Sequence, residues 1–151
     1  MGHRLILFDV DGTLVWPGGA GREAVKRALR EVYGVIGDVD RFPMAGKTDP
    51  LIVRGILRAT GLEEAQIEAG WPRFCQALPR HLAQTVREFS VTPLPGVLPL
   101  LAALSARREV VLGLLTGNLE ETAPIKLRAA GIDPALFRVG AYGSDGADRR
   151  E

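Results

Sequence analysis

Two aspartates separated by one residue follow the first apolar run of the chain. Residues Leu5–Phe8 lead directly into Asp9 and Asp11, within the sequence Asp-Val-Asp-Gly-Thr. Side chains two positions apart at a strand end point to the same side, and ligands of open α/β sheets bind beyond the carboxyl ends of the strands. Two carboxylates there can bind a hard cation such as Mg²⁺, or act as nucleophile and proton donor. The alternative is a simple turn, since Asp and Gly are common turn residues.

A second polar group follows the second apolar run. Val110–Leu115 ends at Thr116, Gly117 and Asn118. If both runs are strands of one parallel sheet, these residues lie at the same edge as the aspartates. The Thr116 hydroxyl and the N–H groups of Gly117 and Asn118, near a helix start, predict an anion site. The alternative is a helix N-cap formed by Thr116 or Asn118.

Lys47 is a candidate cation for the same site. It lies in the sequence Ala-Gly-Lys-Thr, which suggests a phosphate-binding P-loop. That motif needs a glycine where this chain has Arg41, and it needs a preceding strand, which the sequence lacks. Two interpretations remain: Lys47 faces the aspartates from the helical part of the chain, or it is a solvated lysine before a helix.

The segments between these groups predict an α/β fold. Strands at 5–8, 110–115 and 137–142 alternate with helices, an order typical of a parallel sheet. Residues 18–90 show the periodicity of helices and no strand pattern. We expect Pro72 and Pro79 to break or kink the last helix of this region. The expected helices are one ending near Gly34, then about 49–61, 63–89, 97–107 and 119–130.

Composition excludes several classes of protein. The chain has 151 residues, enough for one domain or one domain with an insert. A net charge of +1 argues against a nucleic-acid binder or a basic membrane-surface protein. No apolar run approaches the ~20 residues of a membrane span. The single cysteine, Cys75, allows no internal disulfide, so we expect a reducing compartment such as the cytoplasm.

The apolar strand followed by Asp-x-Asp-Gly-Thr resembles the first signature of the haloacid dehalogenase-like (HAD) hydrolase superfamily. Val110–Asn118 resembles the second signature, an apolar strand ending in Thr or Ser. The helical segment between them resembles the cap of one large subgroup, and Gly46–Pro50 resembles cap segments of phosphoglycolate phosphatase-like members. The resemblance implies a Rossmann-like parallel core with three strands, residues 1–14 and 93–151, and an all-helical cap, residues 15–92.

The resemblance also implies roles for the candidate residues. Asp9 would attack phosphorus and form an aspartyl-phosphate, and Asp11 would protonate the leaving oxygen and then activate water. Mg²⁺ would be held by the Asp9 carboxylate and the backbone carbonyl of Asp11, while Thr116 would bind the phosphoryl group. The implied activity is Mg²⁺-dependent hydrolysis of a small phosphorylated metabolite. Asp11 argues against dehalogenation; Thr13 favours a phosphatase, and a sugar phosphomutase remains an alternative.

Two signatures of the family depart from the pattern. The third is a Lys or Arg near a helix start. Lys126 falls in the middle of an expected helix and comes too early in the chain. Arg149 or Arg150 is better placed, and Arg149 is favoured. The fourth is an acidic pair after another strand. Asp145 and Asp148 follow no apolar strand, so we do not assign them to it.

The missing fourth signature implies that the chain is the N-terminal part of a longer protein. An inactive fragment or a binding module is therefore a rival to the enzyme. The resemblance places two further strands beyond Leu5–Phe8, and without them this strand is an open apolar edge that invites pairing with other chains. We expect the isolated chain to be oligomeric or poorly soluble and to lack measurable phosphatase activity.

Overall fold

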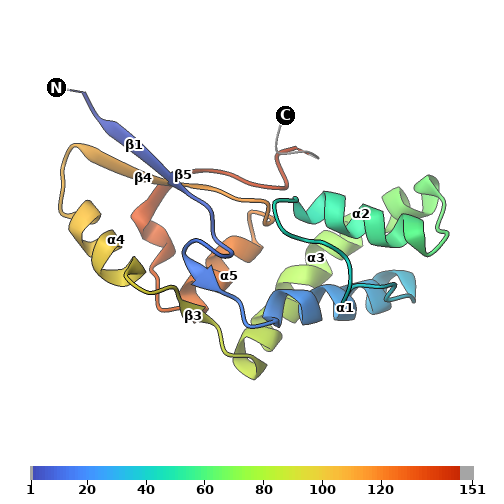
Figure 1. Cartoon of the computed structure of the whole chain (residues 1–151). Helices are drawn as coiled ribbons and strands as arrows, with labels where there is room; N and C mark the ends of the chain where they lie inside the picture. The colour runs from blue at the N-terminus through green and yellow to red at the C-terminus, as the bar shows by residue number, and fades with distance from the viewer. Residues whose placement is uncertain (1, 147–151) are drawn as a thin grey trace.

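The computed structural model describes residues 2–146, and its elements form a sheet half and a helical half (Figure 1). The sheet half comes from both ends of the chain, and the helical half comes from the segment between them. The elements are β1 (Arg4–Phe8), β2 (Val15–Trp16), α1 (Ala20–Tyr33), α2 (Asp49–Ala59), α3 (Glu64–Glu88), β3 (Thr92–Pro93), α4 (Val97–Ser105), β4 (Val110–Leu115), α5 (Thr122–Ala129), the 3₁₀ turn η1 (Pro134–Leu136) and β5 (Phe137–Ala141).

The main sheet is parallel, with strand order β1-β4-β5. This confirms the α/β fold class and the three strands expected from the sequence. Leu7 pairs with Gly113 of β4, and Leu114 pairs with Gly140 of β5. Because all three strands run in one direction, their carboxyl ends meet at one edge, where the polar groups that follow β1 and β4 come together.

Helices α4 and α5 cover one face of this sheet (Figure 1). Ile6 and Phe8 pack against the apolar cluster of this half. Leu5 and Leu7 alternate with them on β1 and are 57% and 46% exposed. The sequence pattern predicted a strand buried on both faces, which is wrong for the described residues. An apolar pattern shows that both faces of a strand could be buried. Whether they are buried depends on whether helices or other strands cover both faces of the sheet.

The helical half forms an apolar core of its own. Helices α1 and α3 make its most extensive contact, and α2 packs beside them. Within residues 20–90, every described regular element is a helix. The largest fully buried side chains of this cluster are Leu29, Ile56, Leu57, Ile67, Phe74 and Leu82.

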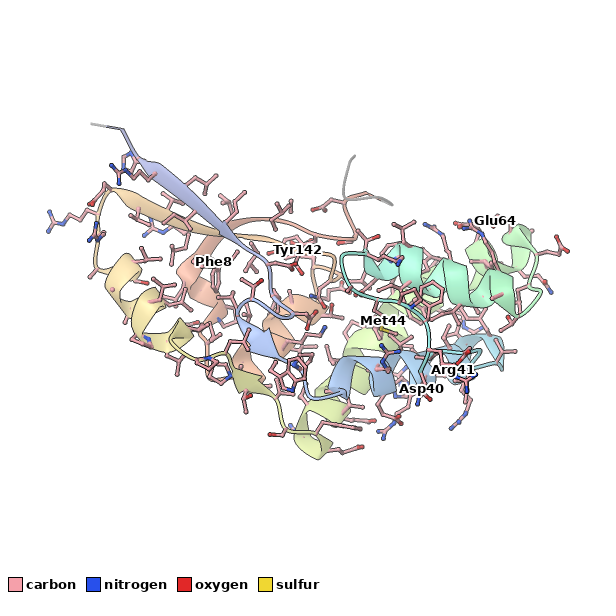
Figure 2. The ribbon with its side chains drawn as sticks, in the orientation of Figure 1. Phe8, Asp40, Arg41, Met44, Glu64 and Tyr142 are labelled. Atoms are coloured by element: carbon pink, nitrogen blue, oxygen red, sulfur yellow. The ribbon has the colours of Figure 1, made fainter. Side chains whose placement is uncertain are left out.

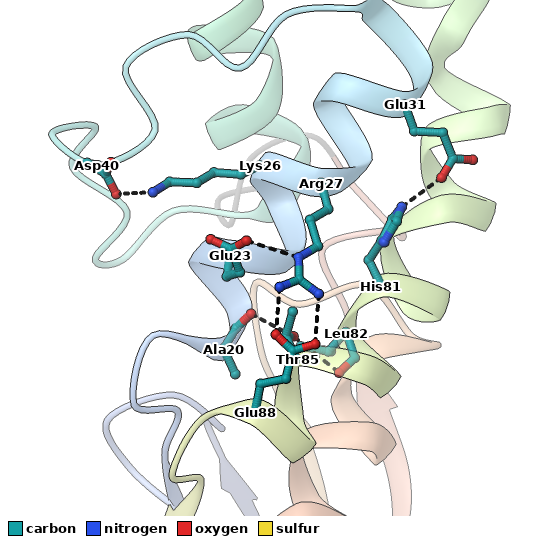
Figure 3. A network of polar contacts seen from close by, with 10 residues as sticks. All are labelled: Ala20, Glu23, Lys26, Arg27, Glu31, Asp40, His81, Leu82, Thr85 and Glu88. Carbon is teal, nitrogen blue, oxygen red and sulfur yellow. Dashed lines mark hydrogen bonds and ion pairs between the residues drawn. The ribbon is translucent and has the colours of Figure 1, made fainter.

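Polar contacts reinforce the pairing of α1 with α3, as Figure 3 shows. The Arg27 guanidinium donates to both carboxylate oxygens of Glu88, at 2.9 and 2.6 Å, and to Glu23 at 2.9 Å. The buried Thr85 hydroxyl donates to the Ala20 carbonyl at 2.9 Å. These contacts join the first half of α1 to the last turns of α3.

Helix α3 runs without interruption through Pro72 and Pro79. We expected these prolines to break or kink the helix, and the break is wrong. Each proline removes one N–H donor, but α3 packs along α1 and contacts α5 as well. In most proteins it is this tertiary packing of an apolar face, more than local propensity, that stabilises a helix.

A two-stranded antiparallel ribbon joins the two halves. Val15 of β2 pairs with Pro93 of β3, and Trp16 pairs with Thr92. The Leu94 N–H also donates to the Leu14 carbonyl at 3.0 Å. The sequence analysis missed both strands, because two residues are too few to show an alternating pattern. Within residues 2–146, no helix has the length and apolarity needed to cross a membrane.

Candidate active site

A cavity of about 520 Å³ lies where the carboxyl edge of the sheet meets the helical half. The predicted residues Asp9, Asp11, Lys47 and the Thr116–Asn118 segment all line it. Arg149 and Arg150 lie outside the described residues. The cavity is also lined by Gly12, Trp16, Pro17, Gly18, Gly19, Gly21, Arg22, Val25, Met44, Ala45, Gly46, Asp49, Ile52, Leu78, Leu82, Thr122 and Lys126.

The two aspartates lie on a tight loop directly after β1. The carbonyl of the fully buried Val10 accepts hydrogen bonds from the N–H groups of Leu14 and Val15, at 2.9 and 3.0 Å. The Val10 N–H donates to Asp9 Oδ1 at 2.8 Å. The loop is therefore anchored at its middle residue, with an aspartate on each side of that residue facing the cavity.

The Thr116–Asn118 segment forms the second wall. The N–H of Thr116 donates to the Ala141 carbonyl at 3.0 Å, which continues the pairing of β4 with β5. The backbone N–H and the Nδ2 of Asn118 both donate to Thr116 Oγ1, at 3.2 and 2.8 Å. Thr116 is buried, and its hydroxyl is held in place by the residue two positions later.

Lys126 connects these two walls, a contact that the sequence analysis missed. Its Nζ donates to both carboxylate oxygens of Asp11, at 3.0 and 2.8 Å, and to Asn118 Oδ1 at 2.6 Å. Asn118 Nδ2 in turn donates to Asp11 Oδ2 at 2.8 Å. The lysine side chain is only 9% exposed and that of Asp11 is 38% exposed. A largely buried ammonium is thus paired with a carboxylate that reaches the cavity.

Lys126 was set aside because it was expected in the middle of a helix, and it does lie in the middle of α5, which runs from Thr122 to Ala129. A position in the middle of a helix does not keep the side chain from the site. Helical side chains point back toward the N-terminus of their helix, and this takes the ammonium to the edge of the sheet. One sequence signal was available: Lys126 shares a helix face with the apolar residues Ala123, Leu127 and Ala130. A lysine in such a stripe is rarely buried unless it is paired.

Asp49 brings a third carboxylate from the helical half. Its Oδ2 accepts from the Leu119 N–H at 3.1 Å, and its own N–H donates to the Gly117 carbonyl at 2.8 Å. Burial raises the pKa of its carboxyl to about 6; Lys126 and the Leu119 N–H oppose this shift, and Asp11 adds to it. The sequence analysis did not single out Asp49, which looked like a residue of a helix start.

The loop that leads into α2, with Lys47 and Thr48, lies very close to the Thr116–Asn118 segment. A Cβ on Gly117 would lie 3.0 Å from Thr48 Cα and closer still to the Lys47 carbonyl, so any side chain there would force the two halves apart. Lys47 itself lines the cavity, while its Nζ donates to the Pro43 carbonyl at 2.8 Å and lies 5.9 Å from the centre of the Phe42 ring. Figure 2 labels Met44 on the same loop, near the boundary of the two halves.

The chemistry of the donors at this edge fits a hard divalent cation. Asp9 and Asp11 supply carboxylate and carbonyl oxygens on one loop, and Mg²⁺ in proteins is often bound through one or two carboxylates with water completing its shell. Lys126 and Asn118 already occupy the Asp11 carboxylate, which favours its backbone carbonyl as the second donor. Among residues 2–146 there is no cluster of three or more His, Cys, Asp or Glu side chains that could hold a metal.

Comparison with known families identifies the fold. The family model of the haloacid dehalogenase-like hydrolases matches residues 3–148. The chain belongs to this family. The resemblance drawn from Asp9, Asp11 and Thr116 is thereby confirmed at the level of the family. A search of curated proteins found no match.

Solved structures share the HAD fold with this chain. CbbY from Rhodobacter sphaeroides, in complex with phosphate, is 21% identical with a TM-score of 0.70, and the alignment covers 95% of this chain and 65% of CbbY. A Haemophilus somnus protein described as a phosphoglycolate phosphatase is 22% identical with a TM-score of 0.65, covering 97% and 65%. A Thermotoga maritima protein described as a β-phosphoglucomutase is 18% identical with a TM-score of 0.52, covering 98% and 64%. This HAD-like chain thus spans 64–65% of the length of these proteins.

Proposed function

We propose that the protein hydrolyses phosphate monoesters of small metabolites through a covalent intermediate on Asp9. The observation that carries this proposal is the link from Asp11 through Lys126 and Asn118 to Thr116. It joins a pair of carboxylates to a hydroxyl- and amide-bearing loop across one cavity. Phosphoryl transfer needs mainly in-line positioning and neutralisation of charge, and these groups supply both.

Asp9 is the nucleophile in this proposal. One of its carboxylate oxygens attacks phosphorus, the bond from phosphorus to the ester oxygen breaks, and an acyl phosphate forms on Asp9. Water then attacks this phosphorus, which releases inorganic phosphate and restores the carboxylate. The anchored loop around Val10 keeps Asp9 at one position through both steps.

Asp11 acts as the general acid and then as the general base. In its carboxylic acid form it donates a proton to the departing ester oxygen, and the resulting carboxylate takes a proton from the water that attacks the intermediate. Lys126 contacts both oxygens of Asp11, so it fixes the orientation of the carboxyl group. We propose Lys126, rather than Arg149, as the cation of the third signature.

The phosphoryl oxygens are bound by the Thr116 hydroxyl and the Gly117 N–H. The Asn118 N–H, which donates to Thr116 Oγ1 at 3.2 Å, would have to turn from that hydroxyl to join them. Mg²⁺ held by Asp9 and Asp11 would supply further positive charge at the transferring group. Gly117 approaches the Lys47–Thr48 backbone, so the loop is held from the side of the helical half as well as by β4 and β5.

Two alternatives have their own observations. A non-catalytic binding module is favoured by the lack of a third acidic metal ligand among residues 2–146. A sugar phosphomutase is compatible with the β-phosphoglucomutase fold match, which shows the fold alone. A mutase would return the phosphoryl group from Asp9 to a sugar hydroxyl rather than to water.

The test uses p-nitrophenyl phosphate with Mg²⁺, whose leaving group departs as an anion without a proton donor. The 151-residue chain is assayed, together with the chain extended by any residues that the gene encodes after Glu151. Asp11→Asn should still form the acyl phosphate from this substrate but should hydrolyse it slowly. We therefore expect a burst of one p-nitrophenolate per protein and a phosphorylated Asp9 in mass spectrometry.

Asp9→Asn is the matched control, because it keeps the side-chain volume and removes the nucleophile. It should give neither the burst nor the modification. Phosphorylation at a residue other than Asp9, or full turnover by Asp9→Asn, would contradict the mechanism. Absence of turnover and of phosphorylation in every chain tested would favour the binding module.

A further inference from the structure

Trp16 is a large aromatic side chain that the proposed mechanism does not use. It lines the same cavity as Asp9 and Asp11, and at 60% it is the most exposed large apolar side chain among residues 2–146. Burying an aromatic side chain contributes strongly to binding, and an exposed aromatic residue in a ligand cavity is a candidate contact surface.

The backbone beneath Trp16 is held on two sides. On one side, Trp16 pairs with Thr92 in the ribbon between the two halves. On the other side, the Gly12 N–H donates to the Val15 carbonyl at 2.9 Å. Val15 is fully buried in the core of the sheet half. Since side chains alternate along a strand, the indole points away from that core and toward the cavity.

The segment after Trp16 keeps the indole close to the phosphoryl site. Pro17, Gly18 and Gly19 add no long side chains before helix α1 begins. A Cβ on Gly21 would lie 3.3 Å from Lys126 Nζ, so the first turn of α1 rests against the ammonium that binds Asp11. Trp16 therefore lies a few residues from backbone that approaches Lys126, the lysine that orients Asp11.

Much of the wall that the helical half gives to the cavity is aliphatic. The helical half contributes the side chains of Val25, Met44, Ile52, Leu78 and Leu82. The polar side chains Arg22, Lys47 and Asp49 also line the cavity; Arg22 donates to the Val39 carbonyl and Lys47 Nζ to that of Pro43. A sugar hydroxyl placed against the aliphatic part of the wall would lack a partner, which costs on the order of 1–3 kcal/mol, whereas an aromatic ring would not.

We propose that the substrates are phosphate monoesters of aromatic alcohols, whose ring stacks on the Trp16 indole while the phosphoryl group lies at Asp9. This inference rests on the proposed function and names its substrate class. The cavity volume of about 520 Å³ is within the range that holds small organic ligands. The indole and the aliphatic wall bind the ring, and the polar loop binds the phosphate.

Binding is measured in the Asp9→Asn background, which prevents turnover. The chain has two tryptophans, Trp16 and Trp71, and Trp71 stacks on Phe74 in the helical half. Trp71→Phe leaves Trp16 as the single indole fluorophore. Phenyl phosphate, cyclohexyl phosphate, glucose 6-phosphate and inorganic phosphate are titrated against this protein, with calorimetry as a second readout.

We expect phenyl phosphate to quench Trp16 and to bind about tenfold more tightly than glucose 6-phosphate. Trp16→Ala should remove this preference, Trp16→Phe should keep most of it, and the affinity for inorganic phosphate should change less than twofold. Because Trp16 is exposed, both variants should fold. Equal or tighter binding of glucose 6-phosphate, or a preference that survives Trp16→Ala, would overturn the inference.

The outcomes separate this inference from the proposed function. If esters are hydrolysed through Asp9 without any preference for aromatic alcohols, the substrate class is wrong and the function stands. If aromatic esters bind at Trp16 but no chain forms an acyl phosphate, the hydrolytic function is wrong and the selective site stands.

Discussion

The helical half and the sheet half differ in how far each completes its own apolar core. In the helical half, Leu29, Ile67 and Phe74 are fully buried among three helices. In the sheet half, Leu5 and Leu7 of β1 and Val139 of β5 are about half exposed. Yet the sheet half carries Asp9, Asp11, Thr116 and Lys126. The part of the chain with the complete core is thus different from the part with the candidate chemistry.

The difference follows from the kind of contact each half uses. Helices α1 and α3 satisfy their own backbone hydrogen bonds and need only apolar faces to pack. A strand needs a neighbour on each side and a cover on each face. Strand β1 has β4 on one side, and α4 and α5 cover one sheet face. Four predictions test whether the helical half provides most of the stability while the sheet half provides the function.

Asp9→Asn should have the largest effect, and on function alone. In whichever chain turns over p-nitrophenyl phosphate, the 151-residue chain or the extended one, we expect kcat to fall by about 10³-fold or more, because the amide cannot attack phosphorus. The free energy of unfolding should change by less than about 1 kcal/mol, since the side chain is half-buried and the amide keeps its shape. Steady-state kinetics and urea unfolding check both values. A large loss of stability would show that the site also supports the sheet half.

Phe74→Ala should have the largest effect on stability. Phe74 is fully buried between helices, so its truncation should cost about 3–5 kcal/mol. Leu7→Ala in the sheet half is the matched control, and at 46% exposure it should cost less than about 1 kcal/mol. Chemical unfolding of both variants gives the comparison. Similar losses would mean that β1 is covered in solution, for example by another chain.

Asp49→Asn should make the stability of the protein less dependent on pH. Burial raises the Asp49 pKa to about 6, so the native state binds this proton more tightly than the unfolded state does. Stability from this group is present below about pH 4 and is lost as the pH rises through about 6. The variant should match the wild type near pH 4 and exceed it by up to roughly 3 kcal/mol above pH 7.

Asp49→Ala separates the charge from the contact. It removes the same titration but also the acceptor for the Leu119 N–H, so it should be less stable than Asp49→Asn at every pH. Unfolding curves at several pH values, without divalent cations, measure this. A stability difference between wild type and Asp49→Asn that does not vary with pH would contradict the raised pKa.

Leu7→Lys should have the smallest effect on the fold and a visible effect on association. The substitution places a charge on the exposed face of the edge strand β1, a device that discourages pairing between strand edges. We expect unfolding to change by about 0.5 kcal/mol or less, while light scattering shows a larger fraction of monomer. An unchanged distribution of sizes would mean that β1 does not mediate association.

The sequence by itself determined the parts of this protein that depend on local pattern. The apolar runs before Asp9 and Thr116 predicted parallel strands, and the periodicity of residues 18–90 predicted helices. Strand direction alone then brings the ends of β1 and β4 to one edge. For this reason the placement of Asp9, Asp11, Thr116, Gly117 and Asn118 around one cavity could be expected without a structure.

Tertiary structure alone decided which distant side chains join these groups. Lys126 is 115 positions from Asp11 in sequence, and it reaches that carboxylate because α5 packs against the core of the sheet half through Ala123 and Leu127. In the sequence, Asp49 is simply a residue at the start of a helix. In the structure, packing of the two halves brings its carboxylate to the Leu119 N–H. Trp16 faces the cavity because β2 pairs with β3 across a large sequence gap. Such contacts depend on how elements pack, and no local pattern of residues encodes the packing of one element against another.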